Sequence, residues 1–465
     1  MSSSSSSEDA ARLARAKVRQ GALRVSAHSA PRAAAGPPPL TTAPAPAPPT
    51  LLSQSYPYAR PRSSFIYING HAFVFDCAAW PAVARGAAWL TDLPVRAPDE
   101  LLRPQQQQDG EAAAAPPTLL LSVAEACERF FGFCARRALE LPPDDGREQQ
   151  HQHQQHQRHR HHFTPILAVG SNAGVSQIAR KFPLELFRDA GGVVVPVVRA
   201  VLDDFDVAYA PLVTSYGSAP ATLHPSPGTR VELFVTHLSP RQARRMHETE
   251  GAYNLQRLTG VALREGAGLE HVGAAGAEPT ATQLLTYGHQ AGTLSLRFRR
   301  GPRRREDDDD GDDDGDDGAE HLETPVALAE INALGRRFPA LTQTQILRAV
   351  RRALADAEES EDGRGQAAAG NGSSSSRIDA DTDALPPPKP LPPILAPEHA
   401  ANCWMATDEA DLDAFLLRCL DCADTRRRRV ALLTAAAVPF ARALPDGHGV
   451  EVLETMGTVL SDNVK

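Results

Sequence analysis

Two stretches of the chain hold residue types that suit acid–base chemistry on a small anionic ligand. Residues 166–172 read Ile-Leu-Ala-Val-Gly-Ser-Asn, an apolar run that breaks at a small polar turn, and residues 247–253 read His-Glu-Thr-Glu-Gly-Ala-Tyr. The first amides of a helix that follows such a turn attract a carboxylate or phosphate group. A carboxylate side chain can accept and return a proton. Together the two stretches predict a site that holds an anion and moves a proton.

The Gly-Ser-Asn turn is expected to connect a strand to a helix. Gly170 can adopt a positive φ or let a ligand approach the main chain, and Ser171 or Asn172 can cap the helix that follows. That helix is indicated by apolar residues at helical spacing, which are Val175, Ile178, Ala179 and Phe182. Glycine turns between strands and helices are common, so a purely structural role for this turn remains an alternative.

Glu250 is the candidate acid–base residue because it is an acid at the C-terminal end of a predicted helix, where a basic residue is favoured. Ser239-Pro240 starts a helix with a capping residue and a first-turn proline, and the pattern ends in acid followed by Gly251. The helix dipole favours a cation at that end, so a carboxylate there suggests a function. Glu248 is the rival for this role, and an ordinary solvated surface acid is the alternative.

The elements around these stretches read as strands. Residues 191–198 are rich in valine, and residues 205–210 and 230–238 alternate apolar and polar side chains. Residues 216–225 are mostly small and end in a turn, which suggests that something lies close to their backbone. Residues 65–75 predict a hairpin around Asn69-Gly70 that joins the same fold.

The C-terminal residues 406–460 carry apolar patterns at helical spacing. They predict helices that pack on the central sheet or barrel. The arginines at 426–429 are expected to lie in a solvated connection between these helices.

The order of these motifs resembles the γ-glutamylcyclotransferase family over residues 163–260. In that family a Tyr-Gly-Ser-Asn turn follows a strand, a Gly-Thr-Ala-like strand comes midway, and a Glu-Gly pair after a later helix supplies the acid–base group. The matching residues are Gly170-Ser171-Asn172, Gly217-Ser218-Ala219 and Glu250-Gly251. The resemblance implies an α+β fold, with a mixed sheet or small barrel of the γ-glutamylcyclotransferase type, added helices and long disordered inserts.

The resemblance also implies a reaction. The α-amine of a γ-glutamyl amide attacks its own side-chain carbonyl and gives 5-oxoproline and a released amine, with Glu250 carrying the proton. The implied ligand-binding residues are Gly170, Ser171, Asn172, Tyr216 and Gly217. The family's chemistry needs no cofactor and no metal.

Val169 departs from the family pattern because it stands where the family has the tyrosine of its opening motif. Tyr216, Tyr253 or Tyr209 is expected to supply the missing phenol. The departure also favours a second function, that of a catalytically inactive member of the fold that acts as a binding or scaffolding protein. A hydrolase with Ser171 as nucleophile is a third interpretation, but no histidine is clearly placed beside that hydroxyl.

Much of the 465-residue chain has a composition that does not support a packed core. Residues 1–55 are expected to form a disordered tail, and residues 60–465 one interrupted α+β domain with its core at 163–299. The expected disordered inserts are residues 104–117, 141–162, 300–322 and 357–392.

The net charge of −9 is concentrated between Glu306 and Asp317, so the remainder of the chain is close to neutral. It predicts no basic face for nucleic acid. No apolar run reaches the roughly 20 residues that a membrane helix needs. We therefore expect a small γ-glutamyl or related amino-acid ligand as partner, and neither nucleic acid nor a membrane.

Six scattered cysteines fit a reducing compartment better than a secreted disulfide scaffold. Cys419 and Cys422 have the spacing of a zinc or redox pair but no second pair nearby, so we expect them to be buried helix cysteines. The histidine-rich tract at 151–162 is expected to be a solvated insert. A cytoplasmic location follows, with an organellar one, in the chloroplast or mitochondrion, as the alternative if the basic residues 12–24 belong to a transit segment.

Overall fold

A closed, mixed β-barrel of five strands forms the centre of the structure, a computed structural model. The expected α+β fold with a small mixed barrel is therefore confirmed. The described residues all lie in the compact unit Leu52–Lys465, which is separate from the unit Met1–Leu51. They are residues 55–84, 89–102, 119–141, 163–214, 217–271, 279–299, 321–354, 394–395 and 423–456.

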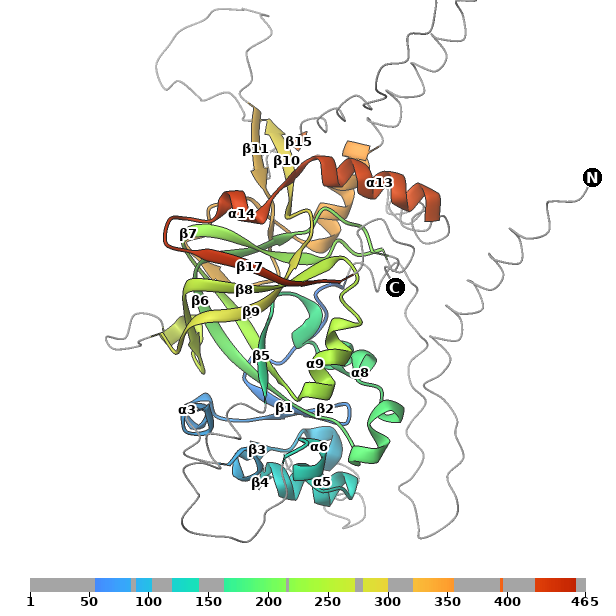
Figure 1. The fold of residues 1–465 in the computed structure, drawn as a ribbon, viewed down its shortest axis with the longest axis vertical. Helices are drawn as coiled ribbons and strands as arrows, with labels where there is room; N and C mark the ends of the chain where they lie inside the picture. The colour runs from blue at the N-terminus through green and yellow to red at the C-terminus, as the bar shows by residue number, and fades with distance from the viewer. Residues whose placement is uncertain are drawn as a thin grey trace, which may run out of the picture. The chain divides into compact units, whose positions relative to one another are not determined.

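The barrel strands follow one another in the cyclic order β6, β7, β5, β9, β8 (Figure 1). Their bounds are β5 Thr164–Ala168, β6 Val194–Tyr209, β7 Ala221–Leu238, β8 Tyr253–Glu265 and β9 Ala281–His289. Neighbours are antiparallel except for β5 and β9, which are parallel. Because the sheet closes on itself, each of these strands has a partner on both sides.

Strand β5 divides its side chains between two cores. Leu167 and Val169 belong to the large cluster that fills the barrel, while Ile166 and Ala168 belong to a cluster on the opposite face. This second cluster includes buried residues of two helices that cover the barrel, α8 (Val175–Lys181) and α9 (Pro240–His247). The alternation of the strand therefore sets where the Gly-Ser-Asn turn leaves the barrel.

Helix α9 begins as the sequence predicts. The Ser239 backbone amide donates to the Gln242 side chain at 2.9 Å, and the Gln242 amide donates to the Ser239 hydroxyl at 3.4 Å. This capping box, with Pro240 in the first turn, satisfies amides that have no partner inside the helix.

The long β6–β7 hairpin replaces the shorter strands expected from the sequence. The separate segments at 205–210 and 230–238 are parts of β6 and β7, and the expected turn after residue 225 lies inside β7. The pairing register shifts there, between Asp203 and Phe205. Gly228 has a φ of 81° and donates its backbone amide to the Asp204 side chain at 2.7 Å. Pro227-Gly228 therefore forms an irregularity within the strand, and the chain does not reverse direction there.

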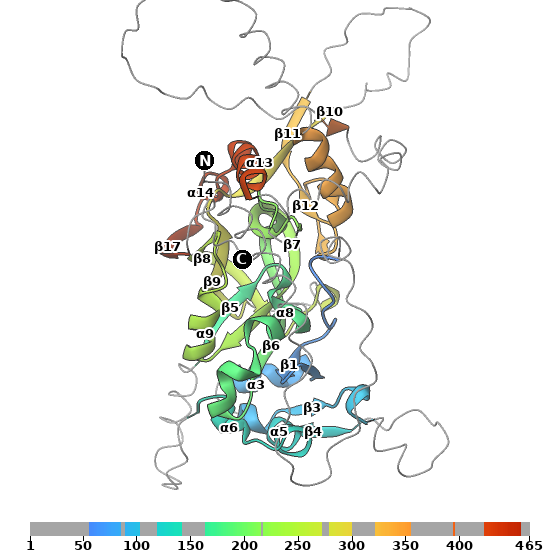
Figure 2. The same cartoon turned by 90° about the vertical axis from the view of Figure 1, so that its right-hand side faces the viewer.

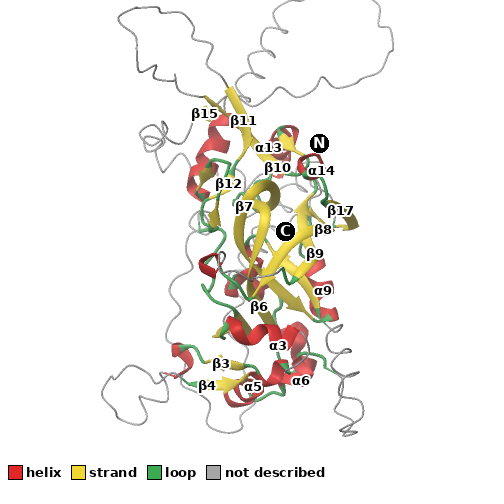
Figure 3. Cartoon of the chain, turned by 90° about the vertical axis from the view of Figure 1, so that its left-hand side faces the viewer, coloured by secondary structure: helices red, strands yellow, loops and turns green. Residues whose placement is uncertain are grey.

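The N-terminal segment adds a second layer with its own core (Figures 2 and 3). The predicted hairpin is confirmed, with φ of 44° at Asn69 and 101° at Gly70, and β1 extends the sheet by pairing with β6. The elements are β1 Phe65–Ile68, β2 His71–Val74, η1 Cys77–Ala79, α3 Trp80–Ala84, η2 Leu90–Asp92, β3 Pro94–Arg96, β4 Leu120–Ser122, α5 Val123–Phe131 and α6 Ala135–Ala138.

The C-terminal region is only partly helical. Strand β17 (Gly449–Thr455) pairs with β8, so the expectation of helices alone is wrong there, and the arginines 426–429 lie inside α13 rather than in a connection. The other elements are η3 Ser171–Ala173, η4 Leu184–Ala190, η5 Leu269–His271, β10 Thr293–Arg299, β11 His321–Pro325, β12 Ala327–Leu328, β13 Ala333–Leu334, β14 Ala340–Leu341, a helix over 343–354, β15 Ile394–Leu395, α13 Ala423–Ala435, β16 Ala437–Val438 and α14 Phe440–Ala443.

Several sequence features lie outside the described residues. They are the histidine tract, the acidic run, the cysteine pair 419–422 and the four expected inserts, apart from residues 141, 321 and 322 at insert edges. Of these, 321 and 322 belong to β11. Among the helices that the structure does describe, none is long and apolar enough to cross a membrane.

The barrel core makes a direct stability prediction. Leu233 is fully buried in the barrel cluster, so Leu233→Ala should lower the free energy of unfolding by about 2–5 kcal/mol through lost burial and a residual cavity. The matched control is Leu120→Ala, at a side chain that is 64% exposed, which should change it by at most about 0.5 kcal/mol. Urea unfolding measures both, and equal losses would contradict the assignment of the core.

Candidate functional site

The two chemically interesting stretches meet in one cavity of about 310 Å³. The turn after β5 contributes Gly170, Ser171 and Asn172 to its lining, and the turn between α9 and β8 contributes Glu250 and Gly251. Asn172 and Glu250 are 78 residues apart in sequence but in direct contact. The structure thus brings the candidate acid and the candidate anion-binding turn together.

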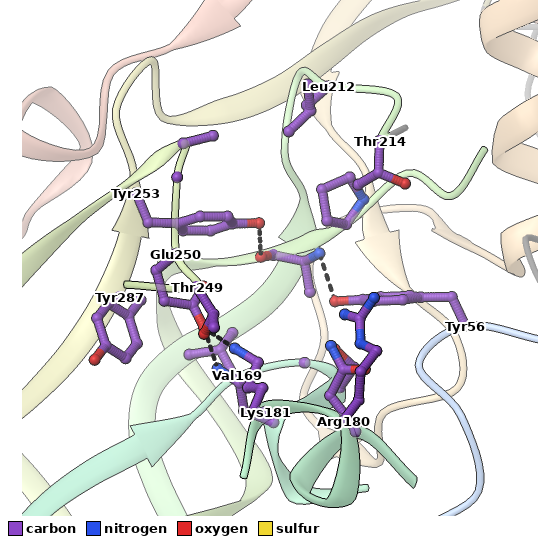
Figure 4. Close-up of a pocket in the computed structure, with 18 of the residues that line it drawn as sticks. Tyr56, Val169, Arg180, Lys181, Leu212, Thr214, Thr249, Glu250, Tyr253 and Tyr287 are labelled. Carbon is purple, nitrogen blue, oxygen red and sulfur yellow. Dashed lines mark hydrogen bonds and ion pairs between the residues drawn. The ribbon is translucent and has the colours of Figure 1, made fainter. Parts of the chain in front are cut away.

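The Glu250 carboxylate is anchored through one of its two oxygens. Its Oε1 accepts a hydrogen bond from Asn172 Nδ2 at 2.9 Å and forms an ion pair with Lys181 Nζ (Figure 4). Its Oε2 accepts no hydrogen bond from the part of the chain that the structure describes. Glu250 is only 8% exposed, so the solvated surface acid considered from the sequence is wrong. The arrangement orients the carboxylate and leaves one oxygen for a ligand.

Lys181 is the unexpected partner at the site. It ends α8, and its side chain is 5% exposed, with Nζ also 3.3 Å from the Met246 sulfur. Burial lowers the pKa of the Lys181 ammonium, and Arg180 and Arg245 lower it further, whereas the Glu250 carboxylate acts in the opposite direction. A buried cation of this kind changes its protonation easily when the surrounding charge changes.

Tyr287 lies near Glu250 and is hydrogen-bonded to His247. Tyr287, which lines the cavity, is buried, and both burial and the nearby Glu250 charge raise the pKa of its phenol. Its hydroxyl is 2.5 Å from His247 Nδ1, and burial lowers the pKa of that imidazole. Glu248, the rival acid, also lines the cavity, but its side chain is 63% exposed and pairs with Arg245 at 2.8 Å. Glu250 is the buried acid of the two.

Two tyrosines hold the small-residue strand at the cavity. The Tyr56 hydroxyl accepts the Ala221 amide at 2.9 Å, and the Tyr253 hydroxyl donates to the Ala221 carbonyl at 2.9 Å. Figure 4 shows these two rings on opposite sides of the cavity. The phenols thus approach the backbone of β7, as its small side chains suggest.

Gly170 is required by this packing rather than by its own φ angle. Its φ is −124°, so of the two roles considered for this glycine the positive φ is not the one found. A Cβ at this position would lie 2.1 Å from the Tyr56 hydroxyl and 3.1 Å from the Ala221 Cβ. The close approach expected at Gly170 is therefore made by a tyrosine of the same chain.

Ser171 and Asn172 do not cap the helix, which corrects the sequence interpretation. Ser171–Ala173 form the 3-10 turn η3, and Gly174 separates it from α8, whose start has no side-chain cap. The intervening glycine moves the helix start to Val175. The Asn172 amide is consequently directed to Glu250.

Two described sequence candidates, Gly217 and Tyr209, do not line the cavity. Gly217 occupies a turn with φ 85° and is not part of the lining, although Thr214 and Pro220 beside it are. Tyr216 lies outside the described residues. Tyr209 donates its hydroxyl to the Leu341 carbonyl at 2.8 Å in the barrel core. Of the three tyrosines considered as replacements, Tyr253 is the one placed at the cavity.

Sequence reasoning missed Lys181, Tyr56 and Tyr287 as site residues. One signal was present for Lys181, because it is the only lysine between residues 18 and 388, where the other strongly basic residues are arginines. Tyr56 and Tyr287 had no such signal, since long-range pairing alone brings them to the site. Within the described part of the chain, no group of three or more His, Cys, Asp or Glu residues is arranged to hold a metal.

The contact between Gly170 and Tyr56 predicts a strong coupling. Gly170→Ala should destabilise the chain by about 1–3 kcal/mol, because the new methyl group displaces the tyrosine hydroxyl from Ala221. Tyr56→Phe removes the clashing oxygen, so the same glycine substitution should cost clearly less in that background. A double-mutant cycle by urea unfolding measures the coupling, and additive effects would exclude the proposed contact.

Burial of Lys181 predicts a pH dependence of stability. Its pKa in the folded chain lies below the ordinary 10.5, so between the two values the unfolded chain binds more protons and stability rises with pH. The free energy of unfolding of wild type minus that of Lys181→Met should therefore increase from neutral pH to about pH 10. Arg180→Met is the comparison: arginine does not titrate in that range but lowers the pKa of Lys181, so its difference from wild type should rise less with pH. A difference that is constant or falls with pH would contradict the lowered pKa.

A scan against protein-family models, a search of curated proteins and a search of solved structures each found no match to this chain. Its function has to be argued from the site.

Proposed function

We propose that the cavity binds a γ-glutamyl amide and that the chain cyclises it to 5-oxoproline with release of an amine. Glu250 is the acid–base residue of this reaction. The observation that carries the proposal is the contact of its carboxylate with Asn172 inside a cavity that also contains Gly170 and Ser171. The order of these motifs is the one that resembles the γ-glutamylcyclotransferases.

The reaction needs a proton carrier beside the reacting amine. The α-ammonium of the ligand gives a proton to Glu250, and the freed amine attacks the γ-carbonyl carbon. The new carbon–nitrogen bond closes the lactam. The bond to the leaving nitrogen breaks as Glu250 returns its proton to that atom, and the second proton lost by the ring nitrogen ends on the released amine, which becomes an ammonium ion. Holding the ligand in the cyclising conformation supplies much of the acceleration.

The size and charge of the cavity support a ligand of this class. Its volume of about 310 Å³ is at the lower end of the range for small-molecule sites. Arg180 and Arg245 line it together with Lys181, so cations are available for the ligand's α-carboxylate. We propose no cofactor, no metal, no nucleic acid and no membrane as partners of this reaction.

Free thiols at the described cysteines support a reducing compartment. They are Cys77, Cys127 and Cys134. We propose the cytoplasm as the location on that basis.

One observation favours the alternative of a binding or scaffolding protein. Val169 lines the cavity where the family has a phenol, and Tyr56 and Tyr253 use their hydroxyls on Ala221. A ligand could then be held without being turned over. Activity measurements separate the two functions.

The test is release of 5-oxoproline from a panel of γ-glutamyl amides by the purified full-length chain. Glu250→Gln should lower kcat by about 10²–10⁴-fold, because the amide cannot carry the proton. The matched control is Glu248→Gln, which removes an exposed acid from the same cavity and should retain kcat within about threefold. An inactive wild type that still binds these compounds in calorimetry would favour the binding protein.

A further inference from the structure

The reaction proposed above moves two protons away from one nitrogen. The α-nitrogen begins as an ammonium group and ends as the single N–H of the lactam. The leaving nitrogen must gain one proton before its bond to carbon breaks, and the released amine gains a second to become an ammonium ion. A lone carboxylate holds only one proton at a time.

Among the described residues that line the cavity, Lys181 carries the only ammonium group, and this group contacts that carboxylate. Lys181 Nζ contacts Glu250 Oε1, and the side chains of both residues are at least nine-tenths buried. Both residues line the cavity, so both reach the space in which a ligand sits. The position of Lys181 is fixed by α8, whose last residue it is.

A ligand ammonium entering this site changes the charge balance. When Lys181 is charged, its charge and that of Glu250 cancel. If the ligand ammonium then binds at Glu250 Oε2, two positive charges face a single carboxylate, whose one negative charge cannot neutralise both. Two like charges in a poorly solvated site disfavour each other. The buried lysine is the one that can give up its proton, and burial already lowers its pKa.

We propose that Lys181 is a second catalytic residue, which shares the proton transfers with Glu250 as an acid–base pair. This inference rests on the proposed function. Lys181 starts neutral in the ligand complex, and Glu250 takes the first proton from the α-ammonium group. After the amine attacks, Lys181 takes the second proton from the ring nitrogen while Glu250 protonates the leaving nitrogen. Lys181 then passes its proton to the released amine, and both side chains return to their starting states.

Other charged groups face the pair and set the background of its titration. They are Arg180 on α8, Arg245, His247 and Glu248 on and after α9, Tyr287 on β9 and Glu454 on β17. A pH profile therefore has to be compared between variants at Lys181, with these groups unchanged. The part of the kcat–pH profile that is lost when Lys181 is replaced reports the titration of Lys181.

Two variants separate a proton carrier from a lysine that only positions Glu250. Lys181→Arg retains the cation that pairs with the carboxylate but cannot become neutral, because the guanidinium group keeps its proton. Lys181→Met removes both properties. If Lys181 carries a proton, both variants lower kcat by about 10²-fold or more, and the rise of kcat with pH that depends on neutral Lys181 is lost.

Arg180→Met is the control at the same cavity: it should raise KM and keep that rise of kcat with pH, moved to higher pH because Arg180 lowers the pKa of Lys181. If the Lys181→Arg variant keeps kcat within about tenfold of wild type, the inference is overturned and Lys181 is a positioning residue. An unchanged pH profile of kcat in the Lys181→Met variant would overturn the inference as well. If Lys181→Met does not fold, the Arg variant, which keeps the ion pair, decides alone. An inactive wild type overturns the proposed function, and a failure confined to these variants overturns only this inference.

Discussion

A buried ion pair between Lys181 and Glu250 is the interaction on which the site depends. Each charge has lost most of its water, which costs several kcal/mol per ion, and only close mutual contact offsets that cost. Such a contact needs both backbones to be fixed. One charge stands at the end of α8 and the other in the turn after α9, two helices that share a hydrophobic cluster on the barrel. The packing of that cluster therefore supports the electrostatics of the cavity.

Barrel closure determines which residues surround this pair. Strand β5 lies between β7 and β9, and the turn that leaves it places Gly170 against Ala221 at the start of β7. Strand β8 begins at Tyr253, directly after the Glu250 turn, and Leu255 pairs with Tyr287 on β9. The parallel pairing of β5 with β9 completes the circuit and brings these segments to one cavity. A one-residue shift in register would move the strand side chains among them, such as Tyr287, to the other face of the strand.

The sequence predicted the features that depend on near neighbours. The helix start at Ser239-Pro240, the hairpin at Asn69-Gly70 and the break after β5 each need only a few adjacent residues, and all are found. The group that approaches Gly170 was not predicted, because Tyr56 is more than one hundred residues away in the chain. The contact of Lys181 with Glu250 was missed for the same reason, since 69 residues separate them. Local patterns thus identified the candidate acid but not the groups that control it.

The presence of an ion pair at this position argues for a ligand rather than for stability. Replacing a buried pair by apolar residues of similar size is often neutral or stabilising by about 1–4 kcal/mol, so a gain in stability does not by itself explain these charges. The surroundings are already suited to an apolar replacement, since Met246 touches Nζ and Val169 lines the same cavity. The second carboxylate oxygen takes no hydrogen bond from the described residues, although forming one would strengthen the pair. A cost in stability, combined with a carboxylate oxygen that no described residue hydrogen-bonds, is consistent with the proposed ligand, which carries a cation of its own.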